Sequence, residues 1–558
     1  MAQQSPDEAN QPPAQLDVAT DHQRSAMPGG EVGRKGDEWK AGRQEWMILA
    51  TLSIISFIIA VDVMILIPAL PTLAHELGGT SAATFWTGTS FLLANAALVP
   101  FIGAISDIFG RRELLMVSLL FFTVGTVVCC TSYAMTQLLV GRTLQGVGAG
   151  GIQTMSYIIV SDIVPLRQRP KYGNFTLLAW GLGAISGPVL GGVIAEHTTW
   201  SWLFYINFPI CGLGLLIVPL TVSLKPEKKR TFAESLAAVD WAGGILFIAS
   251  ISSFLVGLTW AGTQFPWNSY QTLVPIIVGI VGILLSVMYE IHVPALPFLR
   301  VSVFNSLSAV LVYVCTAVHG FLLFSHLFYI MFYYQSIKAI NPTMVAVIMV
   351  AVNLVLFPAS IVTGLMITRF GSFLWAIWGG LAVATLGNGL LFLLDQGRSV
   401  VATVFILLVS SIGQGLLLSA LNVATQTTAK TVDVAYAVTM FMFMRTLGMC
   451  LGVALGGTTF QNVLLRALEE RKVADALAIA VDAESFVARL HAMQNGPTKD
   501  AILESYVKGF HGVFSLLVGL SASCLLSSFF MKHHTLDKKL DSEHKLQGKH
   551  LPKGDSRA

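Results

Sequence analysis

The sequence predicts an all-α integral membrane protein, and three observations lead to this fold class. Only 12% of the 558 residues are charged and 54% are hydrophobic, whereas soluble domains carry about 25% charged residues. Apolar runs of about 20 residues, the length that a helix needs to cross the hydrocarbon core, recur along the chain. The runs lack the alternation of a barrel, so helices that satisfy their own backbone are the expected spanning elements.

Fourteen apolar segments are predicted to span the membrane. In order along the chain they lie near residues 46–70, 83–104, 114–133, 137–163, 173–194, 203–224, 240–260, 271–290, 307–332, 343–367, 374–394, 400–427, 434–463 and 509–531. The polar residues 1–45 and 532–558 form tails, of which the first is expected to be disordered. The segment 464–508 is expected to form an outer loop with an amphipathic helix or a solvated linker helix.

Basic residues in the short loops predict that both tails face the cytoplasm. With that orientation only Lys338 and Arg398 fall in short outer loops, whereas twelve basic residues fall in inner loops. These twelve are Arg111, Arg112, Arg167, Arg169, Lys171, Lys225, Lys228, Lys229, Arg230, Arg300, Arg369 and Lys430. We expect a multi-pass protein of the plasma membrane.

An internal repeat divides the chain into two six-span halves. The glycine pair Gly103 and Gly110 recurs as Gly364 and Gly371 at an offset of 261, and Gln145 recurs as Gln414 at an offset of 269. The pair Gly191–Gly192 recurs at an offset of 265. The halves are then 46–224 and 291–531, separated by a cytoplasmic linker, 225–239, and two inserted spans, 240–290. Repeated halves are typical of secondary transporters, which bind substrate at the interface between them.

A conformational latch is predicted in the loop "GAISDIFGRR" between the second and third spans. Its glycines permit close helix contact, and its acid and arginines can pin one bundle against another at the inner face. A basic anchor loop at the anionic leaflet is the alternative. The latch residues are Gly103, Asp107, Gly110, Arg111 and Arg112.

Several motifs resemble the major facilitator superfamily, and specifically its fourteen-span drug:proton antiporter family as found in fungi. They include "GAISDIFGRR", "LLVGRTLQGVGAGG" (138–151), "VDVMILIPALP" (61–71) and "WSWLFYINFPI" (200–210). The resemblance covers roughly residues 46–531. It implies the major facilitator fold and the efflux of drugs or toxins, with multidrug resistance as one possible consequence. Ile105 and Ile108 depart from the usual latch pattern, and Ser201 replaces a commonly basic residue.

The fifth span carries the pattern that the resemblance associates with antiporters. Gly183, Gly187 and Gly191 recur every four residues on one helix face, which permits tight contact with another helix. Pro188 is expected to bend the helix, and Gly192 completes the motif. Ordinary packing of small residues is the alternative to a role in closing leak pathways.

Four ionisable residues within the spans are candidates for proton coupling. Asp62 lies roughly 24 Å above the inner start of its span, and Arg142 lies at a similar depth, so the two are expected to pair. The resemblance assigns proton coupling to Arg142, although a static buried ion pair is the alternative. His319 and His326 can titrate near neutral pH, or they can serve only as hydrogen-bonded packing residues.

A substrate cavity between the halves is predicted to hold polar and aromatic side chains. Arg445 is costly within a membrane and has no obvious acidic neighbour, so it can meet an anionic part of the substrate, backbone carbonyls or an outer acid. The other candidates are Asn95, Gln145, Asn422, Gln426, Phe328 and Tyr329. Hydrogen bonding between helices is the commoner role of such amides.

The function that these observations favour is proton-coupled efflux of small amphipathic organic compounds, such as drugs, toxins or secondary metabolites, by alternating access. Proton-coupled uptake of a siderophore or nutrient, and a sensor that no longer transports, are the alternatives. The sequence lacks a Walker loop and the motifs of hydrolases and metalloenzymes, so we expect no enzyme activity, catalytic residue, cofactor or metal. The expected partners are substrate, protons and lipid, without nucleic acid, and we expect a monomer.

Overall fold

A computed structural model describes residues 39–79, 81–226, 231–262, 264–294, 296–534, 536 and 544–546. Most of the predicted tails, 1–45 and 532–558, and the basic residues Lys228, Lys229 and Arg230 lie outside the described residues. Within residues 41–558, thirteen described helices are long and apolar enough to cross a membrane. The protein is a multi-pass membrane protein with an all-α fold.

The first half and the linker contain eight α-helices. They are α1 (Arg43–Glu76), α2 (Ser81–Phe109), α3 (Arg111–Cys130), α4 (Met135–Ile163), α5 (Arg169–His197), α6 (Trp202–Tyr205), α7 (Phe208–Thr221) and α8 (Phe232–Ala238). A short 3-10 helix, Leu166–Gln168, precedes α5. Helix α8 begins at a capping box in which Thr231 and Glu234 exchange hydrogen bonds.

The inserted spans are α9 (Trp241–Trp260) and α10 (Tyr270–His292). The second half consists of α11 (Leu307–Ser336), α12 (Pro342–Phe370), α13 (Leu374–Leu390), α14 (Val400–Thr428), α15 (Val434–Glu470), α16 (Ala476–Val481), α17 (Ala483–Ala492) and α18 (Pro497–Ser528). Three 3-10 helices, Val301–Phe304, Leu391–Leu393 and Thr431–Asp433, lie among them. Strand β1 (Leu224–Pro226) pairs antiparallel with strand β2 (His544–Leu546).

Helix α4 accounts for the fourteenth predicted span. It is a single helix of 29 residues, but it does not belong to the thirteen strongly apolar helices because Arg142, its glutamines and its glycines lower its mean hydropathy. Its length of about 43 Å at 1.5 Å per residue is sufficient to cross a bilayer.

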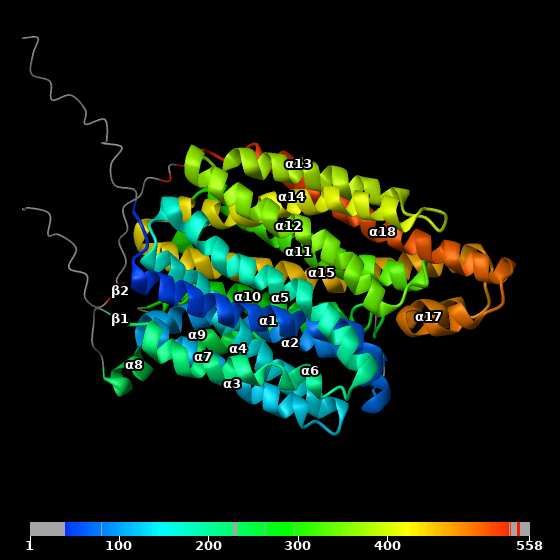
Figure 1. Cartoon of the computed structure of the whole chain (residues 1–558), viewed down its shortest axis with the longest axis horizontal. Coiled ribbons are helices and arrows are strands. Elements are labelled where there is room, and N and C mark those ends of the chain that lie inside the picture. Colours follow the sequence, from blue (N-terminus) through cyan, green and yellow to red (C-terminus); the bar gives the residue numbers. More distant parts are fainter. Residues whose placement is uncertain are drawn as a thin grey trace, which may run out of the picture. The chain divides into compact units, whose positions relative to one another are not determined.

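The predicted outer loop is shorter than expected. Helix α15 continues to Glu470 and α18 begins at Pro497, so parts of the segment 464–508 extend the two neighbouring spans. Ion pairs between the extensions stabilise them: Lys508 Nζ lies 3.1 Å from Glu470 and Arg471 lies 3.0 Å from Glu504. Only α16 and α17 remain as separate loop helices, at the end of the helices opposite to β1 and β2 (Figure 1). We call the end with α17 the outer end and the end with β1 the inner end.

Glycine stripes join equivalent helix pairs in the two halves. A Cβ atom at Gly183 or Gly187 of α5 would collide with the backbone of α1. A Cβ atom at Gly448 or Gly452 of α15 would meet the backbone of α11 in the same way. The two stripes lie 265 residues apart. The repeat inferred from the sequence therefore corresponds to a repeated packing of α1 on α5 and of α11 on α15.

Two further equivalent contacts join one half to the other. Gly103 of α2 packs directly against Thr439 of α15, and Gly364 of α12 packs against Asn174 of α5. The glycines lie 261 residues apart, and their partners lie 265 residues apart. Both contacts between the halves therefore consist of a glycine on one side and a small polar residue on the other.

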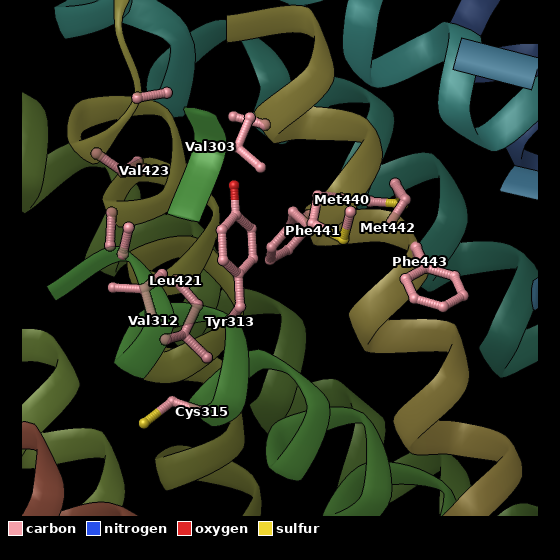
Figure 2. Packing of buried hydrophobic residues seen from close by; sticks show 14 of the residues in the cluster. Val303, Val312, Tyr313, Cys315, Leu421, Val423, Met440, Phe441, Met442 and Phe443 are labelled. Atoms are coloured by element: carbon pink, nitrogen blue, oxygen red, sulfur yellow. The ribbon is translucent and has the colours of Figure 1, made fainter. Parts of the chain in front are cut away.

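A buried apolar cluster holds the inner part of the second half together. Figure 2 shows Tyr313 of α11 at its centre, with side chains of α14 and α15 around it. Phe443 of α15 also contacts Phe247 of α9, with ring centroids 5.6 Å apart. Helix α9 packs against α2 as well, so the inserted spans lie beside the interface between the halves.

Candidate functional site

A buried ion pair joins α1 to α4 within the first half. Arg142 donates from one guanidinium nitrogen to Asp62 Oδ2 over 2.7 Å, and the two residues are 1% and 0% exposed. The guanidinium also lies 4.4 Å from the ring centroid of Phe91. The structure thus brings together Asp62 and Arg142, which were predicted to pair because they lie at a similar depth in the membrane.

Two amides complete the coordination of the Asp62 carboxylate. Asn207 donates to Oδ1 over 2.7 Å, and Gln145 donates to the same oxygen over 3.0 Å. Gln145 also accepts a hydrogen bond of 2.8 Å from Arg142. Gln145, a candidate for the substrate cavity, therefore lies in the ion-pair network, where it is fully buried. Asn207 was not a candidate, because a single Asn in an apolar stretch gives no signal by itself.

A cavity of about 580 Å³ lies between the halves toward the outer end. Arg142 forms part of its wall, so the ion pair borders this space. Phe91, Phe328 and Met331 contribute apolar surface. The candidate Phe328 thus lines the cavity, whereas Tyr329 points away from it and donates to Val453 O over 2.6 Å.

Helix α17 covers part of this outer cavity. Glu484 and His491 face it, and His491 Nε2 lies 3.2 Å from Ser336 O at the end of α11. The side chain of Glu484 is solvent-accessible at the cavity wall. Desolvation by the surrounding protein, together with the negative charge of Asp482, raises the pKa of Glu484 to about 7.

Two smaller cavities, of about 40 and 60 Å³, lie deeper between the halves. Trp180, Phe324 and Arg445 line both of them. Asn95 lines the first, and Gln414 lines the second. Phe324 also lines the outer cavity, so the three spaces share a wall. We call them together the chamber; its walls come from α1, α2, α4, α5, α11, α12, α14 and α15.

Arg445 is buried within this chamber without a carboxylate partner. It is 7% exposed, and its Nε has no hydrogen-bond partner. Among the described residues no acid forms an ion pair with it, and the nearest favourable groups are Tyr157 and the ring of Trp180, whose centroid lies 5.9 Å from Cζ. A charge in such a position costs at least ~2.5–3.5 kcal/mol on insertion scales.

The two histidines of α11 lie on the second-half side of the chamber. His319 is buried, its Nε2 lies 3.2 Å from Gln414 O, and its Nδ1 has no partner. His326 lines the 60 Å³ cavity and its Nε2 lies 3.1 Å from Ser410 Oγ. In the glycine contacts Gly187 meets Val61 O, and the equivalent Gly452 meets Phe321 O. The position equivalent to Asp62 is therefore Leu322, one turn before His326.

Asn422 and Gln426 lie toward the inner end. Both line a further cavity of about 60 Å³, which shares Tyr157 and Thr176 with the wall of the 40 Å³ cavity. Arg169 of α5 donates to Gln426 Oε1 over 2.6 Å. This bond connects the two halves. The two amides, candidates for the substrate cavity, thus lie at the closed inner end and away from the outer cavity.

The latch residues also lie at the inner end. Gly110 adopts a φ of 109°, which favours glycine, and this conformation turns the chain from α2 into α3. Arg111 is 2% exposed and pairs with Asp107 at 2.5 Å and with Asp162 at 3.0 Å. Arg112 is half-buried and forms no ion pair with the described residues.

Asp107 links this group to the second half. It interacts with the hydroxyl of Tyr436 on α15, and Arg300 stacks on the Tyr436 ring with Cζ 4.0 Å from its centroid. Arg300 also pairs with Asp433 at 2.9 Å. These contacts, with the bond of Arg169, close the inner end, whereas the large cavity lies on the outer side. The described conformation is closed at the end with β1 and open toward the end with α17.

The remaining residues of the fifth-span motif lie along α5. Helix α5 runs through Pro188 as one helix, and a Cβ atom at Gly191 would collide with Ile65 O of α1. Gly192 contacts Thr343 of α12. The motif therefore packs α5 on α1 with Gly183, Gly187 and Gly191, and on the second half with Gly192.

Two repeated helical halves around a mostly apolar chamber with a few buried polar groups define a membrane transporter. The chain belongs to the Major Facilitator Superfamily, whose family profile matches residues 52–453. Members of this family are transporters and not enzymes.

The relatives that resemble the chain over nearly its full length come from fungi. It is 36% identical to "MFS transporter L2" of Phoma sp. over 92% of this chain and 86% of that protein. It is 30% identical to "MFS-type efflux pump LUC4" of Fusarium sp., over 92% of each. It is 31% identical to "Acurin A biosynthesis cluster MFS-type transporter" of Aspergillus aculeatus, over 91% of this chain and 93% of that protein.

Solved structures share the fold at low sequence identity. A bacterial homologue of the human lysosomal transporter Spinster, inward-facing and unoccupied, covers 88% of this chain and 98% of its own, with a TM-score of 0.55 and 15% identity. The human organic anion transporter MFSD10 (TETRAN) covers 86% of this chain and 100% of its own, with a TM-score of 0.55 and 14% identity.

Proposed function

We propose that this transporter exports small amphipathic organic compounds in exchange for protons. The observation that carries the proposal is the Asp62–Arg142 ion pair beside the cavity between the halves. Asp62 is fully buried directly behind Arg142, and Arg142 lies in the cavity wall that a substrate would touch. A proton that reaches the carboxylate would therefore change the charge balance of this wall. The Asp62–Arg142 pair can thus couple the binding of a proton to the binding of the substrate.

The ion pair suggests a sequence of steps. In the outward-facing conformation a proton from the outer side reaches Asp62 and neutralises its carboxylate. Arg142 then loses its counter-ion, and the changed electrostatics at the cavity wall favour release of the substrate. Return to an inward-facing conformation requires the inner contacts of Asp107, Tyr436, Arg169 and Gln426 to open. The proton then leaves on the inner side and the pair forms again.

Export is favoured over uptake by two considerations. The relatives "MFS-type efflux pump LUC4" and "Efflux pump FUS6" are named for efflux. The glycine stripe of α5 holds it against α1, and the family pattern associates this motif with antiport. The compounds we propose are amphipathic because apolar rings and a few polar groups share the chamber wall.

We also propose that the inner end faces the cytoplasm and that the protein acts in the plasma membrane as a monomer. Basic residues support this orientation: Arg111, Arg169 and Arg300 lie at the inner end. Lys338, at the outer end, donates to three backbone carbonyls of the loop 395–398, where it serves a local structural role.

Proton flux in sealed vesicles tests the proposal. Purified protein is reconstituted, a pH gradient is imposed, and a panel of amphipathic compounds is added. We expect compound-dependent dissipation of the gradient that Asp62→Asn and Arg142→Ala abolish, whereas Arg471→Gln, at a surface arginine paired with Glu504, leaves it unchanged. Movement of compound and protons in the same direction would indicate uptake. Binding without any flux would indicate a sensor.

A further inference from the structure

We propose that the deep chamber recognises an anionic group of the transported compound, a carboxylate or a comparably acidic oxygen, through Arg445. This inference deepens the proposed function and rests on it, since it assumes that the exported compound passes through this chamber. It assigns a substrate class: an apolar, largely aromatic body that carries one negative charge.

The first argument is the missing counter-ion. Arg445 is 7% exposed and its Nε has no hydrogen-bond partner, and within the described part of the chain no carboxylate pairs with it. Tyr157 and the face of Trp180 offer a neutral oxygen and a π-face. These groups moderate the desolvation of the guanidinium, but they do not neutralise its charge. An anion in the chamber would do so.

The second argument is that Arg445 cannot withdraw from the chamber. A Cβ atom at Gly320 of α11 would collide with the backbone oxygen of Arg445, and one at Gly448 would collide with Ala317 O. The backbone of α15 is therefore held against α11 at Arg445 and at Gly448, about one turn further along α15. The side chain lines both deep cavities, so its charge is directed at the space between the halves.

The third argument is the set of polar groups beside it. Gln414 is 2% exposed, and neither its Oε1 nor its Nε2 has a hydrogen-bond partner. Asn95 is 3% exposed, and its Oδ1 is likewise unpartnered. Both share a cavity wall with Arg445. Buried amides without partners are costly, and a ligand with an anionic oxygen beside other polar atoms could satisfy them.

The charges around the chamber also disfavour a cation. Asp62 is already paired with Arg142, and Arg142 itself borders the outer cavity. Glu484 lies at the outer opening on α17, on the far side of that cavity from the deep cavities that Arg445 lines. His319 is close enough to Arg445 to interact with it electrostatically and adds no negative charge. The deep part of the chamber therefore attracts anions.

Equilibrium binding tests this inference without a gradient. Full-length protein in nanodiscs is dialysed at pH 7 against three probes that share one ring system: pyrenebutyrate, its uncharged amide and the cationic pyrenebutylamine. Empty nanodiscs provide the blank. We expect the carboxylate to bind at least about tenfold more tightly than the amide, since charge-assisted hydrogen bonds are roughly twice as strong as neutral ones.

Variants test whether Arg445 causes the preference for the carboxylate. We expect Arg445→Gln to abolish the preference for the carboxylate, Arg445→Lys to retain part of it, and Gln414→Leu to weaken it. The control is Arg471→Gln, a surface arginine paired with Glu504, which should bind all three probes like the parent. Melting temperatures verify that each variant is folded. A merely structural arginine would change the melting temperature but not the ratio of the affinities.

The inference is overturned if the parent protein binds the three probes equally or prefers the amine, or if folded Arg445→Gln keeps the preference. Since the parent alone can give the first two results, the test stands even if a variant does not fold. Carboxylate preference without compound-dependent proton flux would refute proton-coupled export and leave the anion site intact. Proton-coupled export of neutral compounds without a preference for the carboxylate would refute the anion site and leave proton-coupled export intact.

Discussion

Trp180 and Arg445 occupy equivalent positions in the two halves and face each other in the chamber, with Arg445 Cζ 5.9 Å from the Trp180 ring centroid. They lie 265 residues apart, the same offset that separates Gly183 from Gly448 and Gly187 from Gly452. The repeat thus places an aromatic ring and a guanidinium at the same point of α5 and α15. The packing of the halves is similar, but the chemistry of the two chamber walls differs.

The glycine stripes give a prediction about stability. Gly183→Ala and Gly448→Ala should each destabilise the protein by about 1–3 kcal/mol, because the added methyl group would push a helix away from its partner's backbone. Gly212→Ala of α7 is the matched control, since nothing lies within 4 Å of its added Cβ. It should be neutral or stabilising by up to about 1 kcal/mol. Thermal unfolding in one detergent measures all three, and equal melting temperatures would contradict the packing argument.

Asn207 gives a prediction about the ion-pair network. Asn207→Ala removes a donor from the fully buried Asp62 carboxylate and should cost about 1–3 kcal/mol. Asn95→Ala is the comparison, because Asn95 Oδ1 has no partner to lose. We expect a clear fall in melting temperature for the first variant and a small change for the second. A similar change in both would mean that the bond to Asp62 contributes little.

The inner contacts give a prediction about conformation. Tyr436→Phe keeps the ring beneath Arg300 but removes the hydroxyl that interacts with Asp107. A hydrogen bond to a charged group is worth about 1.5–3 kcal/mol, so the inward-facing population should rise about tenfold or more.

Cysteine labelling can measure this shift. Asn422→Cys, in the inner cavity, should react faster with a membrane-impermeant maleimide added from the inner side when Tyr436→Phe is present. The six native cysteines are buried, so their background should be low. Tyr133→Phe, at a tyrosine that is 91% exposed and takes no part in the inner contacts, is the control and should leave the rate unchanged. An unaltered rate in Tyr436→Phe would show that this contact does not hold the inner end closed.

Glu484 gives a prediction about pH. Desolvation raises its pKa from 4.5 to about 7, so the folded protein holds this proton more tightly than the unfolded chain does. Stability from this group is therefore greatest at low pH and is lost as the pH rises from about 4.5 to 7. We expect hydrogen exchange in α17 to be slower at pH 5 than at pH 8 after correction for the intrinsic rate. Glu484→Gln should remove the difference, and Asp482→Asn should reduce it.

Hydropathy predicts thirteen of the spanning helices, because burial in lipid leaves a continuous apolar signal, whereas α4 is less apolar and is recognised by its length. Their ends were less predictable. Helices α15 and α18 extend beyond the apolar runs because pairs such as Glu470 with Lys508 hold the polar extensions together, and such pairs depend on tertiary contact. The expected outer loop was for this reason too long.

The candidate site was predictable where a charge was involved. Asp62, Arg142 and Arg445 are conspicuous in apolar helices, because each requires a reason to be there. Amides gave a weaker signal: Gln145 and Asn207 bind Asp62, whereas Asn422 and Gln426 lie near the inner end. Which amide meets which charge depends on helix rotation and on the break between α6 and α7, and neither can be read from composition.

The contacts of Gly103 with Thr439 and of Gly364 with Asn174 have a consequence for the rate of transport. At these two points a glycine meets a small side chain, so few rotamers need to change there when the two sides part. Elsewhere along the contact of α5 with α12, the rings of Trp180 and Phe357 lie 5.9 Å apart and must separate. Within each half, by contrast, the stripes of α5 and α15 bring backbone against backbone and leave little freedom to slide. The protein thus consists of rigid groups of helices that separate from each other more easily than their own helices do. A bulkier residue in place of Gly103 or Gly364 would slow the conformational change.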